Sequence, residues 1–224
     1  MHESAKGLGE HRHRTCPAIH DVHNHRLLNT RMTDTRASLL ASIERSRETI
    51  GSLAGSVDQL QTICDVIVGA LQKGNKLLTA GHGGSAADAL HMAEELVGRF
   101  RDDREPLPAI ALVADPTLLT CISNDYGFEH VFPRQVRGLG KPGDILVIFS
   151  TSGKGDGFRL AVEEARRAGL TSVAFLGKGG GPLAGSVDHD VIVEGNETAR
   201  IQEAHTVILH LILERVEEAF TGER

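Results

Sequence analysis

The chain has 224 residues, 40% of them hydrophobic, and a formal net charge of −6 at pH 7. This length suits one large α/β domain with an appendage, and the acidic balance argues against general nucleic-acid binding, which needs a basic face. No apolar run has the length of a membrane span, no signal peptide is evident, and three cysteines without metal-like spacing fit a reducing cytosol. We therefore expect a cytoplasmic protein with no nucleic-acid or membrane partner.

Residues 1–31 differ in composition from the rest of the chain. They hold half of its twelve histidines, interleaved with arginines and few apolar side chains. Histidine-rich tracts can bind metal, but a segment that cannot pack is also expected to be disordered, and Met32 offers a second possible start. We predict a disordered extension over residues 1–31, of open purpose, and a folded domain over residues 32–224.

Two helical patterns follow between Thr33 and Gly74. Their apolar residues recur at spacings of three and four: Leu39, Leu40, Ile43 and Ile50, then Val57, Leu60, Ile63, Ile67 and Leu71. Because both helices precede the first strand, they cannot lie inside a βαβ unit. They are expected to pack outside it, on the sheet or on another subunit.

Short apolar runs then alternate with helical stretches. The predicted strands are residues 76–80, 108–114, 144–151, 171–177 and 189–194, and the predicted helices are residues 85–100, 129–139, 157–168 and 198–220. This alternation indicates a parallel sheet covered on both faces. Ligands bind beyond the carboxyl ends of such strands, so the turns after Ala80 and Phe149 are expected at the functional edge.

The first of these turns reads Gly81-His82-Gly83-Gly84-Ser85. It lacks the lysine of a P-loop and does not follow the dinucleotide-binding pattern. Its glycines would let backbone N–H groups approach a phosphate at the start of the following helix. A tight connection without a ligand is the alternative reading.

The second turn reads Phe149-Ser150-Thr151-Ser152-Gly153-Lys154-Gly155 and places three consecutive hydroxyl groups at the end of a strand. Hydroxyls and backbone N–H groups both donate to phosphate oxygens, although such residues also serve simply as helix caps. Two polar turns at one sheet edge favour a single ligand that carries a phosphate and several hydroxyls.

His91 and Glu95 are four residues apart and therefore project from one helix face. This pair could hold a metal or move protons, or it could be a solvated surface pair. Other candidate polar residues are Gln202, His205 and His210 in the last helix, together with Arg99, Asn124 and Asp125. Asn124-Asp125-Tyr126-Gly127 reads as a turn.

These motifs in this order resemble the sugar isomerase (SIS) domain and, within it, the bacterial phosphoheptose isomerases, over residues 36–220. The resemblance is carried by Gly83-Gly84-Ser85 with Asp88, His91 and Glu95, by Ser123-Asn124-Asp125, by Ser150-Thr151-Ser152-Gly153, and by Arg200-Ile201-Gln202-Glu203 followed by His210. It implies a three-layer α/β sandwich with a five-stranded, flavodoxin-like parallel sheet and two N-terminal helices, assembled as a homotetramer.

The resemblance also implies an activity: the interconversion of sedoheptulose 7-phosphate and D-glycero-D-manno-heptose 7-phosphate, which feeds lipopolysaccharide biosynthesis. Glu95 and His210 would act as base and acid through an enediol(ate). Zinc would be held, in members that bind it, by His91, Glu95, Gln202 and His210. Substrate contacts would come from His82, Gly83, Gly84, Ser85, Glu95, Arg99, Asn124, Asp125, Ser150, Thr151, Ser152 and Gln202.

Three departures from the family pattern affect the expected substrate more than the reaction class. His82 replaces a usual asparagine, Gly155 replaces a residue such as serine, and Ala199 stands where some members carry an acid. Two alternatives follow: an isomerase of another sugar phosphate, or a non-catalytic SIS tetramer that binds the replication initiator DnaA. Retention of Glu95 and His210 favours an enzyme.

Overall fold

The structure, a computed structural model, describes residues 35–222. The chain divides into two units, residues 1–40 and residues 41–224, and helix α1 (Thr35–Gly51) runs across this boundary. The histidine-rich extension predicted at residues 1–31 lies outside the described residues. The fold below is that of the second unit.

Five parallel strands form one sheet in the order β2-β1-β3-β4-β5. The strands are β1 (Leu77–Gly81), β2 (Ala109–Ala111), β3 (Ile145–Ser150), β4 (Thr171–Gly177) and β5 (His189–Val193). Every residue of β1 and β3 is buried, as expected when helices cover both faces of a parallel sheet. The predicted five-stranded, flavodoxin-like parallel sheet is confirmed.

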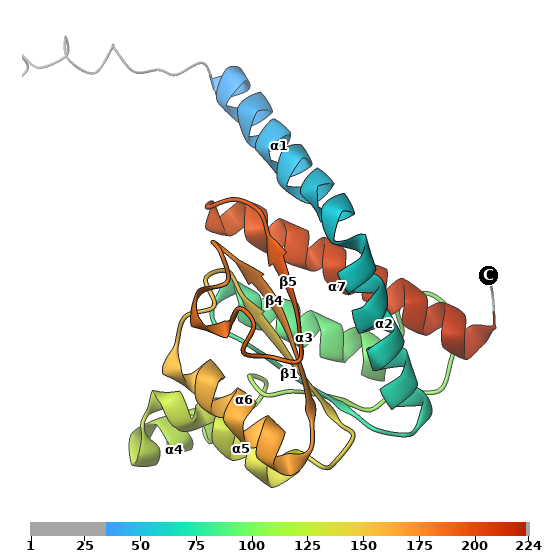
Figure 1. Ribbon diagram of the computed structural model, residues 1–224, viewed down its shortest axis with the longest axis vertical. Helices are drawn as coiled ribbons and strands as arrows, with labels where there is room; N and C mark the ends of the chain where they lie inside the picture. Colours follow the sequence, from blue (N-terminus) through green and yellow to red (C-terminus); the bar gives the residue numbers. More distant parts are fainter. Residues whose placement is uncertain (1–34, 223–224) are drawn as a thin grey trace, which may run out of the picture. The chain divides into compact units, whose positions relative to one another are not determined.

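Helices cover the two faces of the sheet and complete a three-layer sandwich (Figure 1). One face packs against α2 (Val57–Gln72), α3 (Gly84–Val97) and α7 (Thr198–Thr221), which share one hydrophobic core. The other face packs against α4 (Pro116–Tyr126), α5 (Val131–Leu139) and α6 (Asp156–Ala168). Short 3₁₀ segments lie at Ser52–Ser56, Phe128–His130 and Gly181–Leu183.

Helix α2 uses the apolar stripe predicted for it. Leu60, Ile63, Ile67 and Leu71 are buried in the core that α2 shares with α7 and with β5. The prediction that this helix packs on the sheet, outside any βαβ unit, is confirmed. In α1, by contrast, no residue is buried, so the expected packing of that stripe on another subunit stays a prediction.

Helix α4 corrects the reading of Asn124-Asp125-Tyr126-Gly127 as a turn, because its first three residues end a helix. The Asp115 carboxylate caps that helix by accepting hydrogen bonds from two backbone N–H groups, and Pro116 follows at its first position. Gly127, with φ of 95°, terminates it. Among residues 35–222, no helix has the length and apolar character needed to cross a bilayer.

Candidate active site

The strand order places a ligand-binding crevice between β1 and β3. Chain connections leave β1 toward β2 on one side, and the sheet then continues through β3 on the other side. In open α/β sheets, ligands bind at the carboxyl ends of the strands where this reversal occurs. The two predicted turns follow β1 and β3, so both lie at that position.

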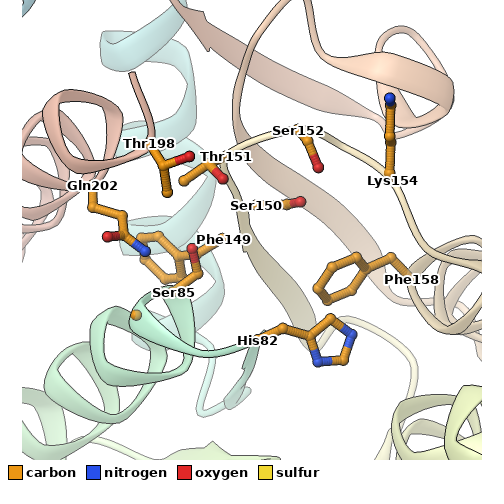
Figure 2. Close-up of a pocket in the computed structure, with 11 residues that line it drawn as sticks. His82, Ser85, Phe149, Ser150, Thr151, Ser152, Lys154, Phe158, Thr198 and Gln202 are labelled. Carbon is orange, nitrogen blue, oxygen red and sulfur yellow. The ribbon is translucent and has the colours of Figure 1, made fainter. Parts of the chain in front are cut away.

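A cavity of about 290 Å³ opens there. Seven of the predicted substrate-binding residues line it: His82, Gly84, Ser85, Ser150, Thr151, Ser152 and Gln202. Figure 2 labels all of these except Gly84, and they come from both turns and from α7. The structure therefore brings the two polar turns together around one space, as the sequence predicts.

The chemistry of this cavity suits an anion. The serine and threonine side chains of the cavity wall present hydroxyl groups, and the first turns of α3 and α7 contribute Ser85 and Thr198 to the wall. Helix N-termini carry partial positive charge and unpaired N–H donors. The backbone N–H of Gly153 donates to Oγ of Ser150 at 3.0 Å, which fixes the second turn. We refer to Ser85 and residues 150–152 as the hydroxyl cradle.

Gly84 allows α7 to approach the start of α3. A Cβ atom at this position would lie 2.2 Å from Nε2 of Gln202, so a larger residue would displace the Gln202 amide. Glycine at this position thus lets an amide from a distant helix join the wall of the cavity.

His82 contributes an aromatic ring at one end of the cavity. Its ring centroid lies 4.6 Å from that of Phe158, 5.0 Å from that of Phe132 and 5.2 Å from that of Phe128. Burial against these rings lowers the pKa of His82, so the imidazole is neutral at neutral pH. His82 therefore offers this end of the cavity a ring and no charge.

His91, Glu95 and His210 form a second group farther along α3 and α7. Nε2 of His91 lies 3.2 Å from Oε1 of Glu95, and the rings of His91 and His210 meet edge to face at 5.2 Å. The Glu95 side chain is only 17% exposed. His91 thus contacts both a carboxylate and a second imidazole, and groups of these types can exchange protons with a ligand or bind a metal.

A part-buried hydrogen bond joins α3 to α7 between the cradle and this second group. The Thr206 hydroxyl lies 3.1 Å from Oδ1 of Asp88, and Asp88 is only 7% exposed. Burial raises the pKa of Asp88, an effect that the hydrogen bond from Thr206 opposes. Gln202, Thr206 and His210 recur every four residues and share one face of α7, so this bond lies in the middle of the site's helix pair.

The metal ligands predicted from the sequence are only partly brought together. Ligand atoms of His91, Glu94 and Glu95 lie within 4.8 Å of one another, and the ring of His210 adjoins His91. Imidazole nitrogens and carboxylate oxygens are donors that zinc accepts, so this group fits the ion. Gln202 lines the cavity instead, and Glu94 is an addition that the sequence reading missed.

Other predicted site residues do not line the cavity. Gly83 lies next to its wall, and Arg99 follows the end of α3. The Asn124 amide donates to Asp125, and Asp125 lines a separate cavity between α4 and α5. His205 lies in the core, where burial lowers its pKa to about 4 even though a hydrogen bond with the carbonyl of Leu176 opposes the shift.

Four residues of the cavity wall were not predicted from the sequence: Phe149, Lys154, Phe158 and Thr198. Lys154 lies within the predicted second turn, although the prediction did not name it as a substrate contact. Thr198 begins α7 and reaches the cavity through the packing of that helix across the sheet. Only the three-dimensional arrangement reveals such a residue.

Comparison with known proteins agrees with this geometry. The family model described as "SIS domain" matches residues 40–177. The chain is 42% identical over 188 residues to a phosphoheptose isomerase of Clostridium acetobutylicum, covering 84% of this chain and 95% of that protein. It is 46% identical over 183 residues to a phosphoheptose isomerase of a Roseiflexus species, covering 82% and 91% respectively.

Solved structures give the same result. A phosphoheptose isomerase from Francisella tularensis superposes with a TM-score of 0.74 at 33% identity, covering 82% of this chain and 96% of that one. A phosphoheptose isomerase from Neisseria gonorrhoeae gives a TM-score of 0.72 at 37% identity, covering 82% and 97%. The chain therefore belongs to the phosphoheptose isomerases of the SIS-domain family, which are aldose–ketose sugar phosphate isomerases.

Proposed function

We propose that this enzyme converts D-sedoheptulose 7-phosphate into D-glycero-D-manno-heptose 7-phosphate through an enediol(ate), as a cytoplasmic homotetramer that feeds lipopolysaccharide biosynthesis. One observation carries the proposal: α3 and α7 each contribute residues both to the wall of the cavity and to the Glu95–His210 group. Ser85 and Glu95 lie on α3, and Gln202 and His210 lie on α7.

The residue types suit the chemistry of a ketose–aldose exchange. The cradle would hold the phosphate, and the amide of Gln202 would bind a sugar oxygen. The Glu95 carboxylate would take a proton from one carbon and return it to its neighbour, while the His210 imidazole would exchange a proton with the oxygen. Zinc, held by His91, Glu95, Gln202 and His210, would polarise the sugar carbonyl when bound.

The distance between the hydroxyl cradle and the Glu95–His210 group indicates how subunits would share a site. Ten residues of helix separate Ser85 from Glu95, which corresponds to about 15 Å along the axis of α3. His91, Glu95 and His210 do not line the cavity that holds the cradle. We therefore infer that the complete site forms where one subunit's cradle meets another subunit's Glu95–His210 group.

Turnover of sedoheptulose 7-phosphate tests the proposal. We expect Glu95→Gln and His210→Gln each to lower kcat about 100-fold or more, because each removes a group that transfers protons. Glu105→Gln is the control, since it neutralises an exposed carboxylate that lies after α3 and outside the candidate site. Size-exclusion chromatography with light scattering would verify that every variant keeps its assembly.

The same protein preparations test whether the enzyme uses zinc. Zinc content and turnover before and after chelation are expected to fall together in the wild type and to recover when zinc is restored. Full activity in both Glu95→Gln and His210→Gln would refute the assigned roles. A wild type that turns over no heptose or hexose phosphate would refute the proposed reaction and favour a non-catalytic binding protein.

A further inference from the structure

The cavity described above contains one cationic side chain. Among the residues of its wall, hydroxyls, aromatic rings and the Gln202 amide carry no charge, and Lys154 alone carries an ammonium group. His82 is neutral at neutral pH because burial lowers its pKa. A phosphate dianion in this cavity would be surrounded by dipoles. Among the residues of the wall, only Lys154 would bring a full positive charge to it.

Lys154 lies in the loop that carries the second turn. It lies two residues after Ser152, between Gly153 and Gly155, whose φ angles are 59° and 124°. These are left-handed backbone conformations that glycine adopts freely. Figure 2 shows Lys154 on the same loop as Ser152, with its ammonium group directed away from Phe158 and His82.

The ammonium group of Lys154 is also uncommitted. Among residues 35–222, no carboxylate forms an ion pair with it. The nearest acid in the sequence, Asp156, lies 3.7 Å from Nε of Arg159 instead. An exposed lysine without a partner, at the mouth of a cavity lined with hydroxyl groups, keeps its full charge for an incoming anion.

Lys178 is a second lysine that could supply a positive charge to the phosphate, but its ammonium group is already hydrogen-bonded. It has φ of 53°, the only positive value for a non-glycine residue in the described part of the chain. Its Nζ donates to Oγ1 of Thr198 at 2.7 Å, and Lys178 itself does not line the cavity. Lys178 therefore holds Thr198 in place at the rim, whereas Lys154 has no such bond.

We propose that Lys154 is the residue that neutralises the substrate's phosphate: its side chain swings from the rim over the cradle and forms a charge-assisted hydrogen bond with a phosphate oxygen. This inference rests on the proposed function, because it takes the cradle as the phosphate subsite. It assigns Lys154 to ground-state binding, far along the ligand from the carbons that exchange protons. Substrate affinity, and not the proton-transfer step, should depend on it.

The test uses the full-length protein and four forms: wild type, Lys154→Gln, Lys154→Arg and Lys73→Gln. Lys73 is an exposed lysine that follows α2 and precedes β1, at the opposite edge of the sheet from the cradle. Titration calorimetry measures the binding of inorganic phosphate at low and at high salt. Steady-state kinetics with sedoheptulose 7-phosphate then separates KM from kcat.

We expect Lys154→Gln to weaken phosphate binding and to raise KM by about tenfold, with kcat unchanged, because one charge-assisted bond is lost. Its phosphate affinity should also depend less on salt than that of the wild type. Lys154→Arg keeps the charge and should recover most of the affinity, and Lys73→Gln should match the wild type.

Equal phosphate affinity and KM in Lys154→Gln and the wild type would overturn the assignment. A wild type that binds no inorganic phosphate would overturn it as well. A loss of affinity shared equally by Lys73→Gln would also overturn it, since that is a general effect of net charge. If phosphate binding depends on Lys154 but sedoheptulose 7-phosphate is not turned over, the proposed reaction fails and the role of Lys154 stands.

Discussion

At the scale of single residues, Thr206 links the two helices that carry the site. Its hydroxyl has one hydrogen, which reaches Oδ1 of Asp88 at 3.1 Å or the backbone oxygen of Gln202 at 3.2 Å. The other carboxyl oxygen of Asp88 is buried and has no partner among the described residues. The bond from Thr206 is thus the only one that this carboxyl group has within residues 35–222.

We predict that Thr206→Val lowers the free energy of unfolding by about 1–3 kcal/mol, because a buried carboxyl group loses its donor. It should also lower kcat about tenfold, since α3 and α7 both carry residues of the site and small displacements weaken catalysis. Thermal unfolding and steady-state kinetics on the same preparation measure both effects.

Thr206→Ser is the matched control, because it keeps the hydroxyl and removes only a methyl group. It should retain most of the stability and of kcat. If Thr206→Val unfolds at a lower temperature but turns over substrate at the wild-type rate, the bond stabilises the fold without positioning the site.

At the scale of secondary-structure elements, Asp144 ties together the starts of two central strands. Its carboxylate accepts hydrogen bonds from the backbone N–H groups of Lys76 at 3.0 Å and Lys141 at 2.8 Å, and it pairs with the Lys76 ammonium. Burial by itself raises the pKa of Asp144, but these three donors outweigh burial and hold its pKa below the usual value.

This depressed pKa predicts how stability depends on pH. A carboxyl group with a lower pKa in the folded state contributes stability that is fully present above its unfolded pKa of about 3.9. That contribution is lost as the pH falls through the folded-state pKa, because the folded protein must then take up the proton. Asp144→Asn should lower the free energy of unfolding at pH 7 by about 2–3 kcal/mol.

Urea unfolding of the wild type and Asp144→Asn between pH 7 and pH 3 measures this difference. The two curves should converge as the pH falls, because the wild type loses the stabilisation that the variant already lacks. Asp65→Asn, which changes an exposed aspartate of α2, should follow the wild type throughout. A difference that stays constant down to pH 3 would mean that Asp144 acts through packing and not through its charge.

Most elements could be predicted from the sequence because their periodicity is local. The run over residues 171–177 coincides with β4, and the run over residues 76–80 is within one residue of β1. The run over residues 108–114 was predicted too long, since β2 is an edge strand that pairs on one side only and ends at Ala111. Helix α4 was underestimated, although Asp115-Pro116 is a helix-start signal.

The candidate site was predictable only as far as its parts lie in short motifs. The two turns and the His91–Glu95 pair could be read directly, because each motif carries its own spacing. The membership of Thr198 depends on how α7 packs beyond the sheet edge, which no local pattern encodes, whereas Lys154 could be read from its place in the second turn. The separation of Glu95 from the cradle likewise becomes visible only in the folded chain.

At the scale of the whole molecule, exposed apolar side chains support the proposed assembly. Ile43, Val57 and Leu211 are 64%, 60% and 40% exposed, and the last two line a groove between α2 and α7. Apolar patches of this kind commonly mark surfaces that another chain covers. In a homotetramer, each proposed site would combine the cradle of one chain with the Glu95–His210 group of another.

This sharing predicts that two inactive variants restore each other. Glu95→Gln damages the proton-transfer group, and Ser152→Asp places a carboxylate in the cradle, where it repels phosphate. When equal amounts of the two chains assemble at random, half of the cradles and half of the Glu95 groups are intact, so about one quarter of the shared sites are complete. Turnover of the mixed assembly should therefore approach about a quarter of the wild-type rate, whereas each variant alone stays inactive. A purification tag on one variant confirms that both chains are present, and a mixed assembly without activity would place the whole site within a single chain.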